Sequence, residues 1–150
     1  MLQRLAASIP QVLPGTVPTV IVDGPKNYRT SVRVASPAEA GAVTATMQRR
    51  AWYAARREGL HLDEATDGFG DPELVGSAVR SVAPTLRLSS TDIDALVTEA
   101  RIERYGAGET MQTAASVPDS LRLILAGRSN LRVALKDGSQ FTVGTLSQGD

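Results

Sequence analysis

Hydrophobic and polar residues alternate in short runs along the last third of the chain. The run 121–125 places Leu121, Leu123 and Leu125 on one face, and Gly127 follows it. A second run covers 131–135, and a third begins at Phe141. Residues 136–139, between these two runs, include an Asp-Gly pair, which favours a tight hairpin turn. The pattern predicts antiparallel strands at 121–125, at 131–135 and from Phe141 onward.

The first third of the chain shows both helical and strand periodicity. Apolar residues at 2, 5, 6 and 9 have helical spacing, so we expect an amphipathic helix that ends at Pro10. The apolar run Thr19–Val22 and the alternating run Tyr28–Val34 predict two strands. Residues 23–27 between them contain a Gly-Pro pair, which favours a hairpin loop.

The most strongly specified helix is predicted between Ser36 and Gly59. Ser36 is suited to be the N-cap, Pro37 the first helical residue and Glu39 the partner of a capping box. Gly59 is suited to end the helix in a left-handed conformation. The predicted apolar stripe consists of Val43, Met47, Ala51 and Ala54, widened by Trp52 and Ala55. A short closing strand is expected at Leu60–Leu62, around the single histidine, His61.

Two further helices are predicted in the middle of the chain, after a Gly-bearing linker at 66–70. In the first, Asp71 is the cap, Pro72 lies in the first turn and Pro84 is the expected end. The second follows Ser89 and Ser90, with apolar residues at 93, 96, 97 and 100. The elements together predict an α+β protein with a ferredoxin-like order of helix, strand, strand, helix and strand in its first part.

Composition and charge exclude several functional classes. The chain has 150 residues, 16 basic and 16 acidic side chains and no cysteine. The balanced charge gives no reason to expect nucleic-acid binding, and the absence of cysteine excludes thiolate catalysis and thiolate metal sites. We expect no membrane insertion, because no apolar run approaches the roughly 20 residues that a spanning helix needs. The start of the chain has no secretory signal pattern, so we expect a cytoplasmic location.

Candidate catalytic residues do not form a recognisable set, and we expect no enzymatic activity, no catalytic residue and no metal site. His61 has Asp63 and Glu64 beside it, but an ordinary surface histidine is the better interpretation. Gly106 to Glu109 do not form a dinucleotide-binding fingerprint, and we interpret their glycines as corner geometry. Four arginines lie in the second half of the 36–59 helix, where a solvated face is favoured over a phosphate or nucleic-acid site: Arg49, Arg50, Arg56 and Arg57.

The C-terminal part resembles the first half of a cyclic nucleotide-binding domain. The matching features are a Tyr-x-x-Gly-Glu corner, an Asp before an apolar strand that ends in a small residue and Gly, and a closing Gly-Asp. They stand here at Tyr105, Gly108 and Glu109, at Asp119 and 121–127, and at Gly149 and Asp150. The resemblance implies a partial antiparallel β-roll, or jelly roll, over 71–150. In that family the phosphate-binding cassette comes after the Gly-Asp, so no cofactor-binding residue is assigned.

The N-terminal part is similar to the end of the cytoplasmic α/β domain of small-conductance mechanosensitive channels. The similarity lies in 51–60, which read AWYAARREGL, and in the strands around Pro18–Val20 and Tyr28–Val34. It covers residues 1–65 and implies a ferredoxin-like unit that lacks its first strand. The expected organisation is therefore 1–65 channel-like, 66–70 linker and 71–150 nucleotide-binding-like.

Together these resemblances imply a cytoplasmic regulatory fragment of a mechanosensitive-type channel. We expect the fragment itself to lack the pore and the phosphate-binding cassette, and to be membrane-associated if it is part of the intact channel. The expected partners are the rest of the channel polypeptide or further copies of the chain. A cyclic nucleotide such as cyclic AMP is expected only for an intact domain, and we expect this chain to bind cyclic AMP or cyclic GMP weakly or not at all. The alternative is a stand-alone soluble nucleotide sensor or interaction module. On either interpretation, a β-roll cut after about four strands would leave edge strands unpaired.

Overall fold

The computed structural model describes residues 1–62, 68–114, 116–137 and 139–150. The chain divides into two compact units. The first comprises Met1–Thr66 together with Glu103–Ser116, and the second comprises Asp67–Ile102 together with Val117–Asp150. The chain thus leaves the first unit, returns to it for one short segment and leaves it again. Of the predicted linker 66–70, residues 66 and 67 lie outside the described ranges, as do Asp63 and Glu64.

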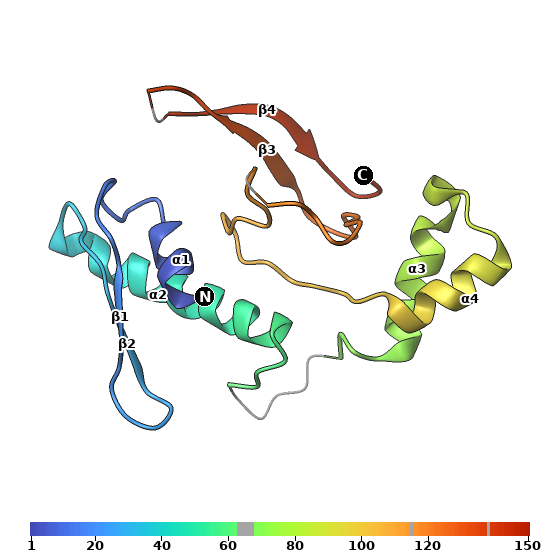
Figure 1. The fold of residues 1–150 in the computed structure, drawn as a ribbon, viewed down its shortest axis with the longest axis horizontal. Helices are drawn as coiled ribbons and strands as arrows, with labels where there is room; N and C mark the ends of the chain where they lie inside the picture. The colour runs from blue at the N-terminus through green and yellow to red at the C-terminus, as the bar shows by residue number, and fades with distance from the viewer. Residues whose placement is uncertain (63–67, 115, 138) are drawn as a thin grey trace. The chain divides into compact units, whose positions relative to one another are not determined.

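In the first unit α1 (Leu2–Ala7) packs against both strands of a β-hairpin and against α2 (Ala40–Arg57) (Figure 1). The strands of the hairpin are β1 (Thr19–Val22) and β2 (Tyr28–Ser31), and the 3₁₀ turn η1 (Pro37–Glu39) precedes α2. Ile9, Val12 and Val43 form the buried core of the unit, and Val32, Val34 and Met47 pack against them. The predicted amphipathic helix at the N-terminus is confirmed, with Leu5 and Ala6 buried.

The predicted 36–59 helix has the expected capping structure at both ends, although its first turn is the 3₁₀ turn η1 and α2 begins only after it. The Ser36 hydroxyl accepts a hydrogen bond from the Ala38 amide, while the Glu39 carboxylate accepts one from the Ser36 amide, which completes the capping box. At the other end Gly59 has a φ of 71°, and the amides of Gly59 and Leu60 donate to the carbonyls of Arg56 and Ala55. This Schellman motif ends the helix as predicted.

The hairpin of the first unit is shorter than its sequence pattern indicates. β1 and β2 pair antiparallel from Thr19 opposite Ser31 to Val22 opposite Tyr28. Beyond Ser31 only Val34 continues the pairing, through an isolated bridge to Val12. The strand predicted at Leu60–Leu62 is wrong. The Leu60 amide is used in the helix cap, and no strand of the described residues lies beside this segment.

The two helices of the second unit are α3 (Pro72–Leu86) and α4 (Ser90–Glu99), which pack against each other (Figure 1). Asp71 caps α3 through the Glu73 amide, and Ser89 caps α4 in a capping box with Asp92. The predicted end of α3 at Pro84 is wrong. Proline removes one backbone donor there, but the helix continues to Leu86 and ends where Arg87 adopts a left-handed φ of 53°.

The predicted C-terminal hairpin is confirmed as β3 (Ser129–Ala134) and β4 (Gln140–Leu146), which pair antiparallel. Gly138 of its turn lies outside the described residues. The register shifts at Leu131 and Arg132, where β4 accommodates one extra residue, as in a β-bulge.

The strand predicted at 121–125 is wrong. Of this run only Ile124 makes ladder-like bonds: its amide donates to the Asp150 carbonyl at 2.9 Å and its carbonyl accepts from the Gly149 amide at 2.9 Å. A single pair of bonds does not establish a strand. The α+β class is confirmed, and each of the two sheets has two strands within the described residues.

Candidate functional site

The Gly-rich corner at Tyr105–Glu109 packs against helix α2 within the first unit. Arg57 of α2 forms an ion pair with Glu109, 52 residues later in the sequence. The Glu109 side chain is 2% exposed and the Arg57 side chain 15%. We call this contact the corner–helix interface and define it as Arg50 and Arg57 of α2 together with Tyr105–Glu109.

Glu109 is held by the corner itself as well as by Arg57. One of its carboxylate oxygens contacts Arg57, and the other accepts a hydrogen bond from the Gly106 amide at 2.8 Å. The Glu109 amide donates in turn to the Gly106 carbonyl at 2.9 Å. The carboxylate therefore bridges the helix and the turn, and it is bound by one guanidinium and one backbone N–H, both of which suit an anion.

Arg57 binds three parts of the returning segment. Besides Glu109, its guanidinium donates to the Arg104 carbonyl, and its central carbon lies 4.0 Å from the centre of the Tyr105 ring. This distance is typical of a cation–π contact. The Tyr105 hydroxyl donates to Glu103 at 2.8 Å. Arg57 thus links α2 to Arg104, Tyr105 and Glu109 by three kinds of interaction.

Arg50 lies seven residues, or about two helical turns, before Arg57 on α2, and it is 2% exposed. Its guanidinium donates to the Ser8 hydroxyl at 2.7 Å and to the Ala107 carbonyl at 3.1 Å, while its Nε has no hydrogen-bond partner. Burial lowers the pKa of Arg50 below its ordinary value, and the nearby negative charge of Glu109 opposes that shift. No described carboxylate lies within ion-pair distance of Arg50.

Two glycines allow the corner to approach the helix this closely. A Cβ atom at Gly106 would lie 3.3 Å from Cγ of Arg50 and 3.5 Å from the Tyr53 ring. Gly108 has a φ of 70°, and a Cβ atom there would lie 2.9 Å from Nη2 of Arg50. The prediction that glycine supplies a positive φ in this corner is confirmed at Gly108.

The structure corrects the expectation that all four arginines lie on a solvated face. Arg49 is exposed, and Arg56 is half-buried with its guanidinium 4.9 Å from the Trp52 ring. Arg50 and Arg57, by contrast, are covered by the corner. The spacing contained a signal for this, because both follow Val43 at intervals of seven residues and so continue the buried stripe.

His61 is exposed, and its Nδ1 lies 3.2 Å from an Arg56 nitrogen. Across residues 1–62, 68–114, 116–137 and 139–150, no three His, Cys, Asp or Glu side chains gather as metal ligands. In the same ranges no helix has both the length and the apolar content needed to span a bilayer.

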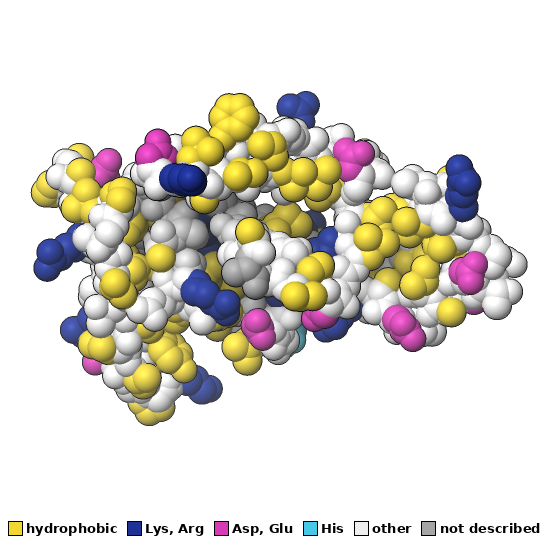
Figure 2. Space-filling view, turned by 45° about the horizontal axis from the view of Figure 1, so that its top comes forward, with side chains coloured by type: hydrophobic (Ala, Val, Ile, Leu, Met, Phe, Trp, Pro, Cys, Tyr) yellow, Lys and Arg dark blue, Asp and Glu magenta, His cyan; other side chains and the backbone are white. Residues whose placement is uncertain are grey.

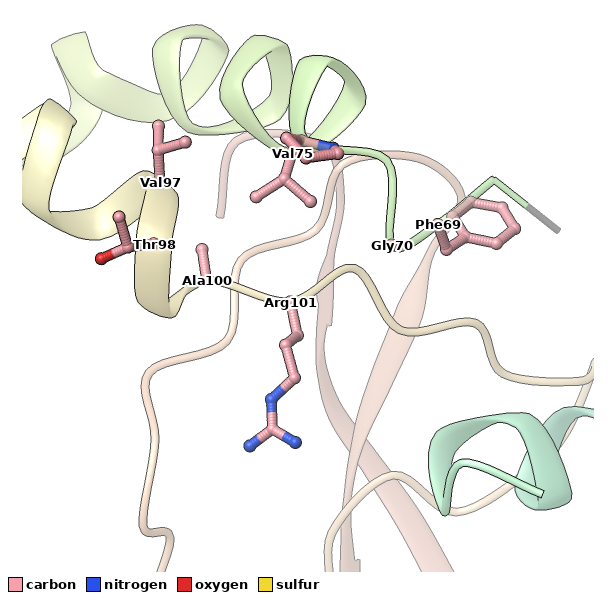
Figure 3. A pocket seen from close by; sticks show the side chains of 8 residues that line it. Phe69, Gly70, Val75, Val97, Thr98, Ala100 and Arg101 are labelled. Carbon is pink, nitrogen blue, oxygen red and sulfur yellow. The ribbon is translucent and has the colours of Figure 1, made fainter.

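A groove of about 430 Å³ lies between the start of α3 and the end of α4. Val75, Val97 and Ala100 point into it, whereas the guanidinium of Arg101 extends away from α3 (Figure 3). Its lining is mostly apolar and lacks the convergent polar groups that orient a small-molecule ligand. The corner–helix interface is therefore the stronger candidate for function.

No protein-family model, curated protein or solved structure matches the chain. The interpretation of the site therefore depends on its geometry and on the sequence motifs.

Proposed function

We propose that this chain is a regulatory coupling module in the cytoplasmic region of a mechanosensitive-type ion channel. In this proposal residues 1–65 are the end of a ferredoxin-like channel domain, and 71–150 are the first part of a β-roll of the cyclic nucleotide-binding type. The observation that carries the proposal is the corner–helix interface, in which the nucleotide-binding-like corner is bound to the channel-like helix by the buried Arg57–Glu109 pair.

The path of the chain supports a coupling role. Glu103–Ser116 belongs to the first unit, while the residues on both sides of it belong to the second. A rearrangement of the second unit therefore acts on both ends of a segment that is bound to α2. Coupling between two sites requires an element with two states that both sites influence, and a bound or released corner is such an element.

The energetics of the ion pair favour two distinct states over gradual loosening. Removing one member of a buried pair leaves an uncompensated charge, which costs about 3–5 kcal/mol. A small displacement that separates Arg57 from Glu109 without admitting water is therefore unfavourable. The corner is expected either to remain bound with all its contacts or to be released into solvent.

Patch-clamp recording of the protein expressed from its complete gene tests the channel role. We expect currents that are activated by membrane tension and a tension threshold that cyclic AMP shifts. The Arg57→Met variant should lose the response to cyclic AMP while it still opens under tension. The control is Asp23→Asn, which removes an ion pair with Arg29 in the same unit, where the side chains are 50% and 64% exposed. That variant should behave like the parent.

Two results would contradict the proposal. A complete protein without tension-activated current would exclude the channel role, and unchanged cyclic AMP dependence in Arg57→Met would exclude coupling through the corner. Calorimetry on the 150-residue chain tests the stand-alone sensor. Micromolar affinity for cyclic AMP would favour that alternative over a regulatory fragment.

Hydrogen exchange on the 150-residue chain measures the interface directly. With a loss of about 3–5 kcal/mol, Arg57→Met should accelerate amide exchange in the corner by about 100-fold or more. Asp23→Asn should leave those rates unchanged. Equal exchange in the two variants would show that the ion pair does not hold the corner on α2.

A further inference from the structure

The corner–helix interface contains more positive than negative buried charge. Arg50 and Arg57 contribute two guanidinium groups, and Glu109 contributes one carboxylate. Arg50 interacts with two neutral oxygens, those of Ser8 and Ala107, and its Nε has no acceptor. Buried charges in proteins are normally paired. Two buried cations beside one buried anion could therefore accommodate one more negative charge.

The donors that hold Glu109 are those of an anion-binding site. A guanidinium and the backbone N–H of a Gly-rich turn bind the two oxygens of a single carboxylate. Release of the corner would also free the Arg50 donor that now bonds to Ala107 and the Arg57 donor that now bonds to Arg104. Both guanidinium groups, seven residues apart on α2, would then face solvent without a carboxylate partner.

We propose that the corner–helix interface is an anion-exchange site, at which a dianionic phosphate monoester competes with Glu109 for Arg50 and Arg57 and releases the corner. This inference rests on the proposed function, since it assigns a ligand that would control the same two states. Glu109 then acts as an internal ligand that occupies the site when phosphate is absent.

Charge selects the class of ligand. A phosphate monoester carries a charge of about −1.5 to −2 at neutral pH and has three strong acceptor oxygens, so it can neutralise both guanidinium groups. The Glu109 carboxylate and the phosphodiester of a cyclic nucleotide each carry a single negative charge. We therefore expect a monoester to release the corner and a cyclic nucleotide not to release it at this site.

The test measures amide exchange in 103–109 of the complete 150-residue chain, with inorganic phosphate as the probe and sodium chloride at matched ionic strength as the reference. Phosphate is expected to bind only the state in which the corner is released. At a phosphate concentration about ten times the dissociation constant of that complex, amide exchange in 103–109 should accelerate about tenfold. Acetate and cyclic AMP should have no effect. Equal exchange in phosphate and chloride would overturn the proposal.

Three variants assign the effect to the interface. Glu109→Gln removes the internal competitor, so calorimetry should show phosphate binding about tenfold tighter than in the parent. Arg50→Met removes the second guanidinium and should abolish the phosphate effect, and Arg50→Lys, which keeps the charge but loses the planar fork, should weaken it. Asp23→Asn is the matched control. Phosphate binding that Glu109→Gln leaves unchanged would contradict competition.

The reference measurement in sodium chloride distinguishes a failure of this inference from a failure of the proposed function. If Arg57→Met loosens the corner in chloride but phosphate has no effect on the parent, the corner–helix interface stands and anion exchange is excluded. Two further probes identify the source of the phosphate, namely adenosine monophosphate and vesicles of phosphatidylcholine with and without phosphatidic acid. A response to either monoester supports the proposal, and a response to neither overturns it.

Discussion

In most proteins hydrophobic side chains are buried and charged side chains are exposed, but the corner–helix interface and the β3–β4 hairpin show the reverse. The interface covers two arginines and a glutamate, whereas the hairpin exposes large hydrophobic residues, among them Phe141 at 62% and Val143 at 58%. Hydrophobic side chains are visible on the molecular surface in Figure 2. The interface joins segments about 50 residues apart, while the hairpin joins neighbouring ones. Burial here follows from long-range contacts more than from residue type.

Amide exchange should reveal the largest difference between the two regions. Helix α2 continues from the capped turn η1, ends in the Gly59 cap and contributes Val43 to the buried core. A two-stranded hairpin with an exposed apolar face is, by contrast, marginally stable in water. We expect central α2 amides to exchange at least about 100-fold more slowly than those of β3 and β4. Equal protection, measured by mass spectrometry at neutral pH, would show that the hairpin is covered.

Replacing one glycine in the corner and one just before β3 should give a smaller effect, which separates the cost of backbone strain from the cost of a steric contact. Gly108 and Gly127 both have positive φ, at 70° and 89°, but a Cβ atom would meet Arg50 only at Gly108. The left-handed conformation alone costs about 1 kcal/mol for alanine.

We therefore expect Gly127→Ala to lower the free energy of unfolding by about 1 kcal/mol and Gly108→Ala by about 2 kcal/mol. Urea denaturation followed by circular dichroism measures both. Equal losses would mean that Arg50 moves aside at no cost and that the corner tolerates a looser approach.

The smallest expected effect concerns pH and the hairpin turn. Asp137 accepts hydrogen bonds from the Ser139 hydroxyl and the Ser139 amide, and these bonds lower the pKa of Asp137 below its ordinary value. A lowered folded-state pKa means that the stabilisation is complete above about pH 4, the ordinary value for aspartate, and is lost as pH falls through the lower folded-state value.

Proton exchange and chemical shifts of β4 should therefore change at acidic pH. Asp137→Asn keeps an acceptor for Ser139 but cannot titrate, so it should remove this change. A pH response that persists in Asp137→Asn would assign the effect to another group. Replacing Ser89, the N-cap of α4, by alanine provides a comparison elsewhere in the chain, because hydrogen bonds from Ser89 lower the pKa of Asp92 in the same way.

The features that sequence predicted correctly are those that depend on neighbouring residues. The Ser36–Glu39 capping box, the Gly59 cap and the loop of the β1–β2 hairpin involve residues within a few positions of one another. Their residue types fix their hydrogen bonds. The predicted strand at 121–125 has the expected alternation, but a strand also needs a neighbouring strand along its length, and the described backbone ladder here consists of the two Ile124 bonds.

The candidate site was only partly predictable for the same reason. The sequence indicated the Tyr105–Glu109 corner and the arginines of α2 separately. Nothing within ten residues of Arg50 indicates that the Ala107 carbonyl will be its acceptor, because that contact depends on the path of the chain through 58–102. The seven-residue spacing of Val43, Arg50 and Arg57 was the one local sign that these arginines would be covered.

The packing of Trp52 gives the protein an intrinsic optical probe. Trp52 is the only tryptophan, and its ring meets the ring of Tyr53 edge to face with centroids 5.1 Å apart. Tyr53 in turn lies against Gly106 of the corner. Departure of the corner would admit water beside this aromatic pair, so the emission wavelength and quenching of Trp52 can follow the two states in real time without any added label.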